Sequence, residues 1–506
     1  MTDLVRADEQ VTETVDGITF GFDLPDWIYW TYIAFTVALR VLAIFVVPRN
    51  RRPQTATAWL LAIMFIPEIG WIFFLLFGSR HVGGKRRERQ AEVSRFIAQT
   101  THGMEFVVDK EKWPEWLESI GDLNRRLGSM PLVGGSTATG FYPDYEESIA
   151  AMTQSVREAQ RTVHAEFYIF GLDATTQDFF DAMAEAVQRG VVVRVLLDHV
   201  ANLRLPLFKA TKRFFQANGI KWQLMLPLQP FKGKWQRPDL RNHRKLLVVD
   251  GQVAFTGSQN LIDSSYDKPS NIKRGLHWKD LMVRFEGPIV GGIDALFITD
   301  WYSETGEILL DEVGEAAPQD HDDIIDSQVV PSGPGFEGEN NLRLFNALVY
   351  AARKRLIITS PYFVPDDSML YAITTAAQKG LDVQLFVSEI GDQAMVFHAQ
   401  RSYYEMLLEA GVRIWLYSAP TILHAKHFTV DDDVAVVGSS NMDMRSFSLN
   451  YEISVMVRSR KFVRQLRAIE DAYRAESREL TMSEWVKRPA RSKALDTVAR
   501  LTAGLQ

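Results

Sequence analysis

Apolar residues form two long runs near the N-terminus and only shorter runs along the rest of the chain. The long runs cover residues 27–47 and 56–77, and a helix needs about 20 apolar residues to cross a membrane. The residues before the first run are acidic, whereas a secretory signal peptide would begin with a basic region. The pattern therefore predicts a two-helix membrane anchor that stays on the mature protein.

Basic residues on either side of the second run predict the orientation of this anchor. They are more numerous after the second run than in the turn between the runs, and the side richer in Lys and Arg is normally cytoplasmic. Both termini are then expected inside the cell. However, Arg40 and Glu68 lie within the apolar runs, where charge is costly. Two alternatives remain: a hairpin that enters only the inner leaflet, and two buried helices of a soluble protein. The basic residues compared are Arg80, Lys85, Arg86, Arg87, Arg89 and Arg95 after the runs, and Arg49, Arg51 and Arg52 between them.

Beyond the anchor, hydrophobic periodicity alternates between strand and helix, and the same order occurs twice. The first copy predicts strands at 163–170 and 191–197 around a helix at 176–188. The second copy predicts strands at 355–359 and 383–387 around a helix at 368–378. The sequences 188–190 and 378–380 correspond at a shift of 190 residues. The chain is therefore predicted to be an α/β protein built from two duplicated, βαβ-rich halves.

Composition shifts suggest where these parts begin and end. Residues 486–506 mix basic and apolar side chains, which is compatible with a membrane surface but more typical of an ordinary terminal helix. The predicted organisation is an acidic tail (1–26), the anchor (27–79), a connector (80–145), the first half (146–303), an acidic linker (304–328), the second half (329–485) and a C-terminal tail (486–506).

Overall composition excludes several classes of function. The net charge of −7 disfavours a nucleic-acid-binding protein, which would normally carry a basic surplus. The chain has no cysteine, which excludes disulfides, thiolate metal sites and cysteine nucleophiles. With 506 residues it is long enough for two or three domains with large cores.

One motif occurs at the same position in both halves and carries the candidate chemistry. Strand side chains alternate between faces, so a His and a Lys two residues apart point the same way, as do a Ser and an Asn two residues apart. Each copy thus offers a nucleophile that can carry a proton, together with several donors for a phosphate. The two copies predict one symmetrical centre for phosphoryl transfer. They are His243, Lys245, Asp250, Ser258 and Asn260, and His424, Lys426, Asp431, Ser439 and Asn441.

This double motif resembles the phospholipase D superfamily. Longer stretches at 240–245, 360–366 and 438–452, together with the apolar leader, are similar to the bacterial cardiolipin synthases of that superfamily. The resemblance implies a duplicated phospholipase D-type fold with one active site between its halves. It also implies a multi-pass protein of the bacterial inner membrane, whose catalytic part faces the cytoplasm. The implied reaction joins two phosphatidylglycerol molecules to give cardiolipin and glycerol.

The resemblance also assigns roles to the motif residues. It implies that His243 is the nucleophile and His424 the general acid and base, although the internal symmetry leaves the reverse assignment open. Lys245, Lys426 and the motif serines and asparagines (Ser258, Asn260, Ser439 and Asn441) would hold the phosphate oxygens. Because the lysines supply positive charge, no metal or other cofactor is expected.

Each histidine also needs a carboxylate to fix its tautomer and orientation. Asp250 and Asp431 belong to the catalytic motif, but each follows a strand at a turn, where Asp is favoured for local backbone bonding, so we interpret them as structural. Asp280 and Glu452 lie downstream of the two copies and are followed by alternating strands. We predict that these two orient the histidines, and the resemblance points to the same positions.

Other functions remain open from the sequence. A phospholipase D that hydrolyses phospholipids to phosphatidic acid would use the same residues, and another donor such as phosphatidylethanolamine would also fit them. A nuclease is disfavoured by the anchor and the charge, and a non-enzymatic scaffold by two intact motifs. Residues 231–237 mix aromatic and basic side chains, which is compatible with an anionic lipid surface or with an ordinary exposed loop.

Overall fold

The computed structural model describes most of the chain and divides it into two units. One unit ends at Gly78 and the other begins at Ser79. The predicted acidic tail and loop 231–237 lie mostly outside the described residues, as do parts of the predicted connector and linker. The described residues are 25–49, 51, 53–78, 84, 86–90, 92, 107, 113–229, 236–309, 312, 316–319, 323–336 and 338–501.

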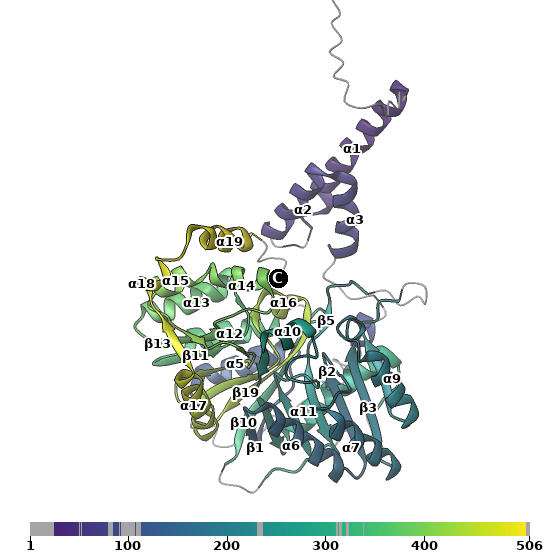
Figure 1. Ribbon diagram of the computed structural model, residues 1–506, viewed down its shortest axis with the longest axis vertical. Coiled ribbons are helices and arrows are strands. Elements are labelled where there is room, and N and C mark those ends of the chain that lie inside the picture. Colours follow the sequence, from purple (N-terminus) through teal and green to yellow (C-terminus); the bar gives the residue numbers. More distant parts are fainter. Residues whose placement is uncertain are drawn as a thin grey trace, which may run out of the picture. The chain divides into compact units, whose positions relative to one another are not determined.

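The described residues of the N-terminal unit form three helices rather than the predicted two. They are α1 (Asp26–Val46), α2 (Pro53–Phe65) and α3 (Pro67–Phe77) (Figure 1). Among the described residues, only α1 is long and apolar enough to cross a membrane. The second apolar run is broken because Pro67 begins a new helix after Ile66, whose backbone is not helical. The prediction of one long helix over 56–77 is therefore wrong.

Helices α2 and α3 fold back on each other as a hairpin. A Cβ atom on Gly70 would lie only 2.8 Å from the Cα of Ile63, so this glycine permits close packing of the two helices. At the open end, the Arg51 Nη2 donates a hydrogen bond of 2.8 Å to the carbonyl of Gly78. The hairpin therefore begins and ends at nearly the same place.

The closed end of this hairpin contacts the middle of α1. The Arg40 Nε donates a hydrogen bond of 3.1 Å to the carbonyl of Met64, near the end of α2. The Trp71 Nε1 donates to the carbonyl of Leu39 at 3.0 Å. A helix end leaves carbonyls without partners, so Arg40 satisfies one of them. The charged Arg40 therefore joins α1 to the end of α2, although it lies within an apolar run.

The larger unit is organised around one 16-stranded sheet within the described residues. Its first half contains β1 (Leu132–Tyr142), α6 (Tyr145–Glu158), β2 (Thr162–Phe167), α7 (Gln177–Gln188), β3 (Val192–Asp198), α8 (His199–Leu203), α9 (Phe208–Ala217), β4 (Lys221–Met225), β5 (Arg241–Asn242), β6 (Lys245–Val249), β7 (Val253–Gly257), α10 (Pro269–Arg274), β8 (His277–Lys279), β9 (Met282–Glu286) and α11 (Ile289–Thr305).

The second half repeats this order, and α5 (Glu115–Arg126) precedes both halves. It contains β10 (Ile325–Ser332), α12 (Asn340–Ala351), β11 (Arg355–Thr359), β12 (Phe363–Val364), α13 (Asp367–Gln378), β13 (Asp382–Ser388), α14 (Ala394–Arg401), α15 (Tyr404–Glu409), β14 (Arg413–Tyr417), β15 (Thr421–Leu423), β16 (His427–Val430), β17 (Val434–Gly438), β18 (Met442–Asp443), α16 (Met444–Ser448), β19 (Asn450–Arg458), α17 (Arg460–Ala475), β20 (Ser477–Leu480), α18 (Met482–Trp485) and α19 (Ala490–Arg500).

Strand pairing confirms the predicted duplication. In the first half β2, β3 and β4 are parallel, and β2, β6, β7 and β9 continue as antiparallel neighbours. In the second half β11, β13 and β14 are parallel, and β11, β16, β17 and β19 are antiparallel. The halves, teal and green to yellow in Figure 1, join where β1 pairs with β10.

The predicted helices and strands of both repeats are present, and their ends differ from the predicted ones by at most three residues. Helices α7 and α13 each end just before a glycine, Gly190 and Gly380, whose φ angles are 92° and 90°. This left-handed conformation is strained for other residues, so glycine ends both helices before the next buried strand. All six residues of β2 are buried, as expected for a strand covered on both faces.

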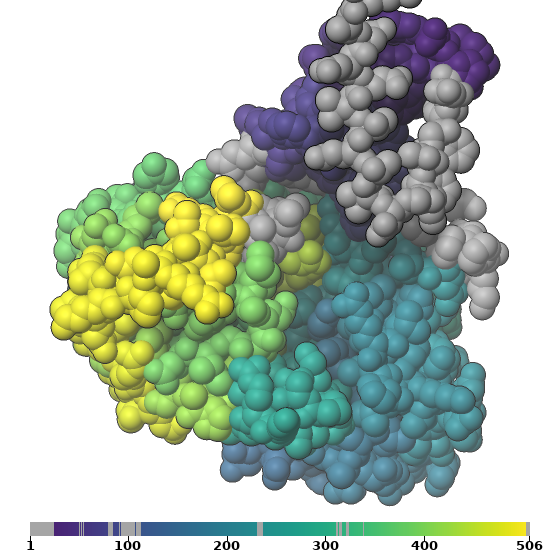
Figure 2. Space-filling view, turned by 45° about the horizontal axis from the view of Figure 1, so that its top comes forward, coloured from purple at the N-terminus to yellow at the C-terminus, as the bar shows by residue number. Residues whose placement is uncertain are grey.

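Two short strand pairs also connect the halves outside the antiparallel core. Strand β5 of the first half pairs in parallel with β19 of the second. Strand β8 of the first half pairs in parallel with β15 of the second. Figure 2 shows the teal surface of the first half set against the green surface of the second. These pairs bring each motif beside a strand of the opposite half.

Candidate active site

The two motif histidines lie where these short strand pairs end. His243 follows β5, and its backbone N–H donates to the carbonyl of Tyr451 in the opposite half at 2.9 Å. His424 follows β15, and its backbone N–H donates to the carbonyl of Lys279 at 2.7 Å. Both side chains are largely buried, with 9% and 5% of the residue exposed. The backbone of each half thus fixes the histidine of the other.

The orienting carboxylates are exchanged between the halves in the same way. The Nδ1 of His243 lies 3.0 Å from both carboxylate oxygens of Glu452. The Nδ1 of His424 lies 2.7 Å from the Oδ1 of Asp280. A carboxylate at Nδ1 favours the tautomer that carries its proton there, which leaves Nε2 free for chemistry.

Their electrostatic surroundings keep both carboxylates ionised. Burial alone would raise the pKa of Asp280, but His424, Lys426 and Ser258 outweigh it, and the pKa is lowered. Burial would likewise raise the pKa of Glu452, but His243, Lys245 and Ser439 lower it overall. Two buried negative charges therefore stand behind the two imidazoles.

The motif serines contact these carboxylates. The Ser258 Oγ donates to Asp280 at 2.6 Å and accepts a hydrogen bond from the backbone N–H of Leu281 at 3.0 Å. The Ser439 Oγ donates to Glu452 and accepts from the backbone N–H of Ile453 at 3.0 Å. Both hydroxyls are thus occupied by protein groups, which differs from the predicted role in binding the phosphate.

The motif lysines lie buried beside the histidines. The Nζ of Lys245 donates to the carbonyl of His243 at 2.6 Å, and the Nζ of Lys426 donates to that of His424 at 2.5 Å. An ammonium has three protons, so each keeps further donors for a ligand. Burial lowers the pKa of Lys426 to about 8 and brings that of Lys245 well below its usual value. A bound anion would favour their charged forms.

The motif asparagines differ in their surroundings. The Nδ2 of Asn260 donates to the Tyr266 hydroxyl at 2.8 Å, and its Oδ1 accepts from the backbone N–H of Ile169 at 3.2 Å. The Oδ1 of Asn441 is buried without a hydrogen-bond partner among the described residues. A buried polar atom without a partner is costly, so the Asn441 Oδ1 is available to accept a hydrogen bond from a ligand hydroxyl, but it cannot donate to a phosphate oxygen.

Asp250 and Asp431 lie at the opposite ends of the strands from the histidines. Both have left-handed backbones, with φ angles of 55° and 50°. The Asp250 carboxylate accepts hydrogen bonds from backbone N–H groups at the start of β2, and Asp431 does the same at the start of β11. Although both belong to the catalytic motif, these carboxylates hold strand ends together, far from the imidazoles.

Comparisons with known proteins match both halves of the chain. Residues 152–280 and 346–472 match the family model described as cardiolipin synthase, PLD-like domain. Residues 38–79 match a model described as phospholipase D-nuclease N-terminal. Cardiolipin synthase A of Proteus mirabilis is 32% identical over 479 residues, which cover 94% of this chain and 96% of the relative. That of Serratia proteamaculans is 33% identical over 470 residues, with coverages of 91% and 93%.

The chain belongs to the cardiolipin synthase family of phospholipase D-like proteins. A solved structure supports the fold independently. Phosphatidylserine synthase of Haemophilus influenzae superposes with a TM-score of 0.57 at 16% identity, and the match covers 78% of this chain and 99% of that one. At this identity the likeness concerns the fold alone.

Two tyrosines of this cardiolipin synthase family member were missed from the sequence. The ring of Tyr168 packs edge-on against His243 with 5.0 Å between centroids, and that of Tyr362 packs against His424 at 6.5 Å. Burial raises the pKa of Tyr168 to about 12, so its hydroxyl stays protonated. Tyr168 directly follows β2 and Tyr362 follows β11, but the strand registers align Tyr168 with Pro361, so the repeat pattern did not mark these tyrosines.

Burial makes both histidines weak bases in the absence of a ligand. It lowers the pKa of His243 and of His424 to about 4, although Glu452 and Asp280 oppose the shift. Both imidazoles are therefore neutral near pH 7. A phosphodiester between them would add negative charge and raise the pKa of each, which favours the one protonated imidazole that acid catalysis needs.

Proposed function

We propose that this protein is a cardiolipin synthase that transfers a phosphatidyl group from one phosphatidylglycerol to another. The observation that carries the proposal is the crosswise arrangement of two buried imidazoles, each held by a carboxylate of the other half. This arrangement suits a reaction that needs a nucleophile and a proton carrier on opposite sides of one phosphorus. The family of the chain supports the choice of lipid substrates.

In the first half-reaction, the Nε2 of His243 attacks the phosphorus of phosphatidylglycerol. The bond between phosphorus and the glycerol oxygen breaks while His424 donates its proton to that oxygen. Glycerol leaves, and the phosphatidyl group stays on His243 as a phosphohistidine. Glu452 stabilises the positive charge on His243 during the attack.

The second half-reaction runs the same steps in reverse with a new alcohol. His424, now neutral, takes the proton from the glycerol hydroxyl of a second phosphatidylglycerol. That oxygen attacks the phosphorus, the bond between phosphorus and nitrogen breaks, and cardiolipin forms. Lys245 and Lys426 stabilise the negative charge that develops on the phosphate oxygens in both steps.

Lipid product analysis tests this proposal directly. The full chain in detergent is incubated with phosphatidylglycerol labelled in both an acyl chain and the headgroup glycerol, beside His243→Ala and His424→Ala variants. Cardiolipin and free glycerol from the unsubstituted protein alone are expected. Phosphatidic acid as the labelled lipid product would instead show a hydrolase. If neither product forms, phosphatidylethanolamine is the next donor to supply.

The family and the apolar helix α1 associate this protein with a membrane. We propose that α1 crosses it once, and that α2 and α3 enter and return on the same side. Helices of 13 and 11 residues are about 20 and 17 Å long, against about 30 Å for the hydrocarbon core. The bond between Arg51 and Gly78 supports this return.

This topology places all the basic residues around the hairpin on one side, which the positive-inside rule makes cytoplasmic. The catalytic unit is then cytoplasmic and the acidic tail faces outward, in contrast to the expectation of two spans with both termini inside. A Thr12→Cys variant tests it, because the chain has no other cysteine. Labelling by an impermeant maleimide in intact spheroplasts is expected. Labelling only after permeabilisation would support two spans.

A further inference from the structure

The C-terminal helix α19 presents apolar side chains to solvent. Leu495, Val498 and Leu501 are 46%, 58% and 85% exposed. Together with the exposed Ala494 they lie at positions i, i+1, i+4 and i+7, which share one side of a helix. An exposed apolar stripe of this kind is typical of an interaction surface.

The opposite side of α19 is held firmly on the catalytic unit. Asp496 is 3% exposed, and its carboxylate lies 2.7 Å from the Nδ1 of His398 on α14. Arg401 and Arg488 also pair with this carboxylate. Helix α19 packs along α14, so its apolar side faces outward from a fixed position.

Exposed charges within the segment that carries the stripe all have one sign, although the exposed Glu405 and Asp367 lie on neighbouring elements. Between residues 486 and 501, the exposed charged residues are Lys487, Arg491, Lys493 and Arg500. The only acidic residue of this segment is the buried Asp496. The chain as a whole carries a net charge of −7, so this basic surplus is local.

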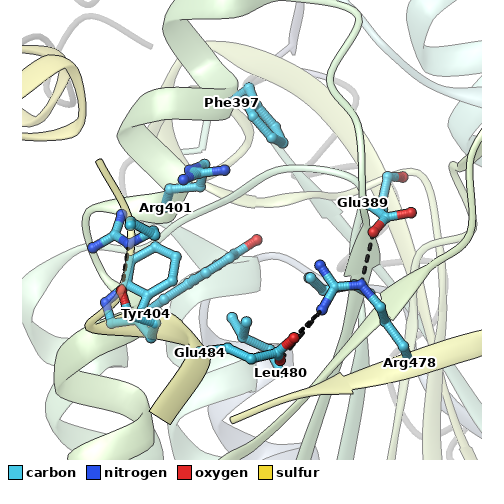
Figure 3. Close-up of a pocket in the computed structure, with 11 residues that line it drawn as sticks. Glu389, Phe397, Arg401, Tyr404, Arg478, Leu480 and Glu484 are labelled. Carbon is cyan, nitrogen blue, oxygen red and sulfur yellow. Dashed lines mark hydrogen bonds and ion pairs between the residues drawn. The ribbon is translucent and has the colours of Figure 1, made fainter. Parts of the chain in front are cut away.

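The neighbouring cavity does not account for these basic residues. Trp485 and Arg488, just before α19, help to line a cavity of about 220 Å³ (Figure 3). Its other two arginines, Arg401 and Arg478, pair with Asp496 and Glu389, and Arg488 also pairs with Asp496. The cavity is therefore close to charge balance, and the positive surplus lies on the outer surface of α19.

We propose that α19 is a second membrane contact, which docks on an anionic lipid surface through its apolar stripe and surrounding basic residues. An amphipathic helix with this composition lies in the plane of the interface, where apolar burial and attraction to anionic headgroups add. A bilayer fits better than a second copy of this chain, because two like-charged helices would repel each other. Docking through α19 would fix the orientation of the catalytic unit toward its lipid substrates.

A single-cysteine fluorescence experiment tests this contact, because the natural chain has no cysteine. The full chain carrying Val498→Cys is labelled with an environment-sensitive dye and reconstituted into nanodiscs that contain phosphatidylglycerol. The control is Glu185→Cys, on the exposed side of α7. Lipids that carry a quencher near the headgroup are expected to reduce fluorescence at position 498 and not at 185. Equal fluorescence with and without quencher at position 498 would overturn the proposal.

Charge substitutions on the stripe provide a second readout. The double substitution Leu495→Glu and Val498→Glu lies on exposed positions, so the fold should be retained. It is expected to abolish quenching of a dye at a Leu501→Cys position on the same stripe, while Thr497→Glu leaves most of it. A dye signal at 498 that depends on protein concentration and not on the quencher would assign the stripe to self-association and overturn the proposal. Neither readout requires catalysis. A failure of membrane docking can therefore be distinguished from a failure of the proposed synthase activity.

Discussion

At the scale of single residues, the site depends on two carboxylates that are buried and yet ionised. Each stays charged because a lysine and an imidazole lie close by, and a serine hydroxyl donates to it. The serine, carboxylate and histidine thus form a chain of hydrogen bonds that begins at the backbone and ends at the imidazole. The two chains are similar in geometry, so the different roles of the histidines need an experiment.

Removing the two carboxylate charges separately distinguishes the two roles. Glu452→Gln and Asp280→Asn should each lower kcat by roughly a hundredfold to ten-thousandfold with phosphatidylglycerol, by analogy with loss of the orienting Asp in a Ser-His-Asp triad. A phosphatidyl ester with a nitrophenol leaving group needs no proton for departure. In a single-turnover release of nitrophenol, Asp280→Asn should therefore recover most of the rate, whereas Glu452→Gln should not.

If Glu452→Gln recovered most of the rate with the nitrophenol ester and Asp280→Asn did not, His424 would be the nucleophile. Thr256→Ser serves as the control, since Thr256 is buried close to the same strands but contacts neither carboxylate. Its rates should stay near those of the unsubstituted protein with both substrates.

The buried histidines also predict how stability depends on pH. In the folded protein their pKa is lowered to about 4, whereas an unfolded histidine has a pKa of about 6.5. Between these pH values the unfolded chain binds more protons than the folded protein. The contribution of the histidines to the free energy of unfolding is therefore fully present above pH 6.5, and it falls as the pH drops toward 4. Thermal unfolding should show this loss, and a His243→Gln and His424→Gln double variant should show a smaller one. An equal loss in the variant would assign the effect to other groups.

At the scale of elements, turns and helix ends explain residues that the motif alone would assign to catalysis. Asp250 and Asp431 each bind several backbone N–H groups at the start of a neighbouring strand. The segments they tie together are β2 to β6 and β11 to β16. The same motif therefore contains residues for chemistry at one end of a strand and residues for folding at the other.

Asp431→Ala should lower stability far more than catalysis. Loss of the acceptor leaves N–H groups at the start of β11 without their partner, which costs about 1 to 3 kcal/mol. We expect a lower midpoint of urea unfolding, with kcat per folded molecule nearly unchanged. Asp432→Ala, at the exposed neighbouring position, is the matched control and should change neither. A large loss of kcat with normal stability would return Asp431 to the catalytic residues.

Gly70 is expected to control the closure of the membrane hairpin. A Cβ there would meet the backbone of α2 at 2.8 Å, so Gly70→Leu should separate α2 from α3. The expected result is a lower thermal midpoint of the full chain in detergent and faster proteolysis between residues 53 and 77. Ile69→Leu, at an exposed position next to it, is the control. An unchanged midpoint and cleavage pattern would contradict the close packing.

At the scale of the whole molecule, the active site belongs to neither half alone. The strand pairs β5 with β19 and β8 with β15 carry each histidine to the carboxylate of the opposite half. Duplication thus provided two copies of the motif, and the exchange of partners made one centre from them. The halves are joined in the sheet through β1 and β10.

Cutting the chain in the linker tests this dependence. Fragments 1–319 and 320–506, purified separately, should each be inactive because neither contains a histidine with its own orienting carboxylate. Co-expression should restore cardiolipin formation, since β1 and β10 can still pair. Activity of the first fragment alone would contradict the exchanged arrangement.

The sequence alone was sufficient for the repeated α/β order and the two motifs, and it predicted the two carboxylates that contact the histidines. These features are local: a spacing of two on a strand, a glycine after a helix and an aspartate at a turn each act within a few residues. Tertiary structure alone decided which carboxylate serves which histidine, that the serines hold those carboxylates, and that Tyr168 and Tyr362 flank the imidazoles. It also decided that the second apolar run folds into a hairpin. Hydropathy does not distinguish one continuous helix from two antiparallel helices that meet at Pro67. The contacts of His243 with Glu452 and of His424 with Asp280 join residues 209 and 144 positions apart, and they arise from pairing of the two halves, which no local pattern contains.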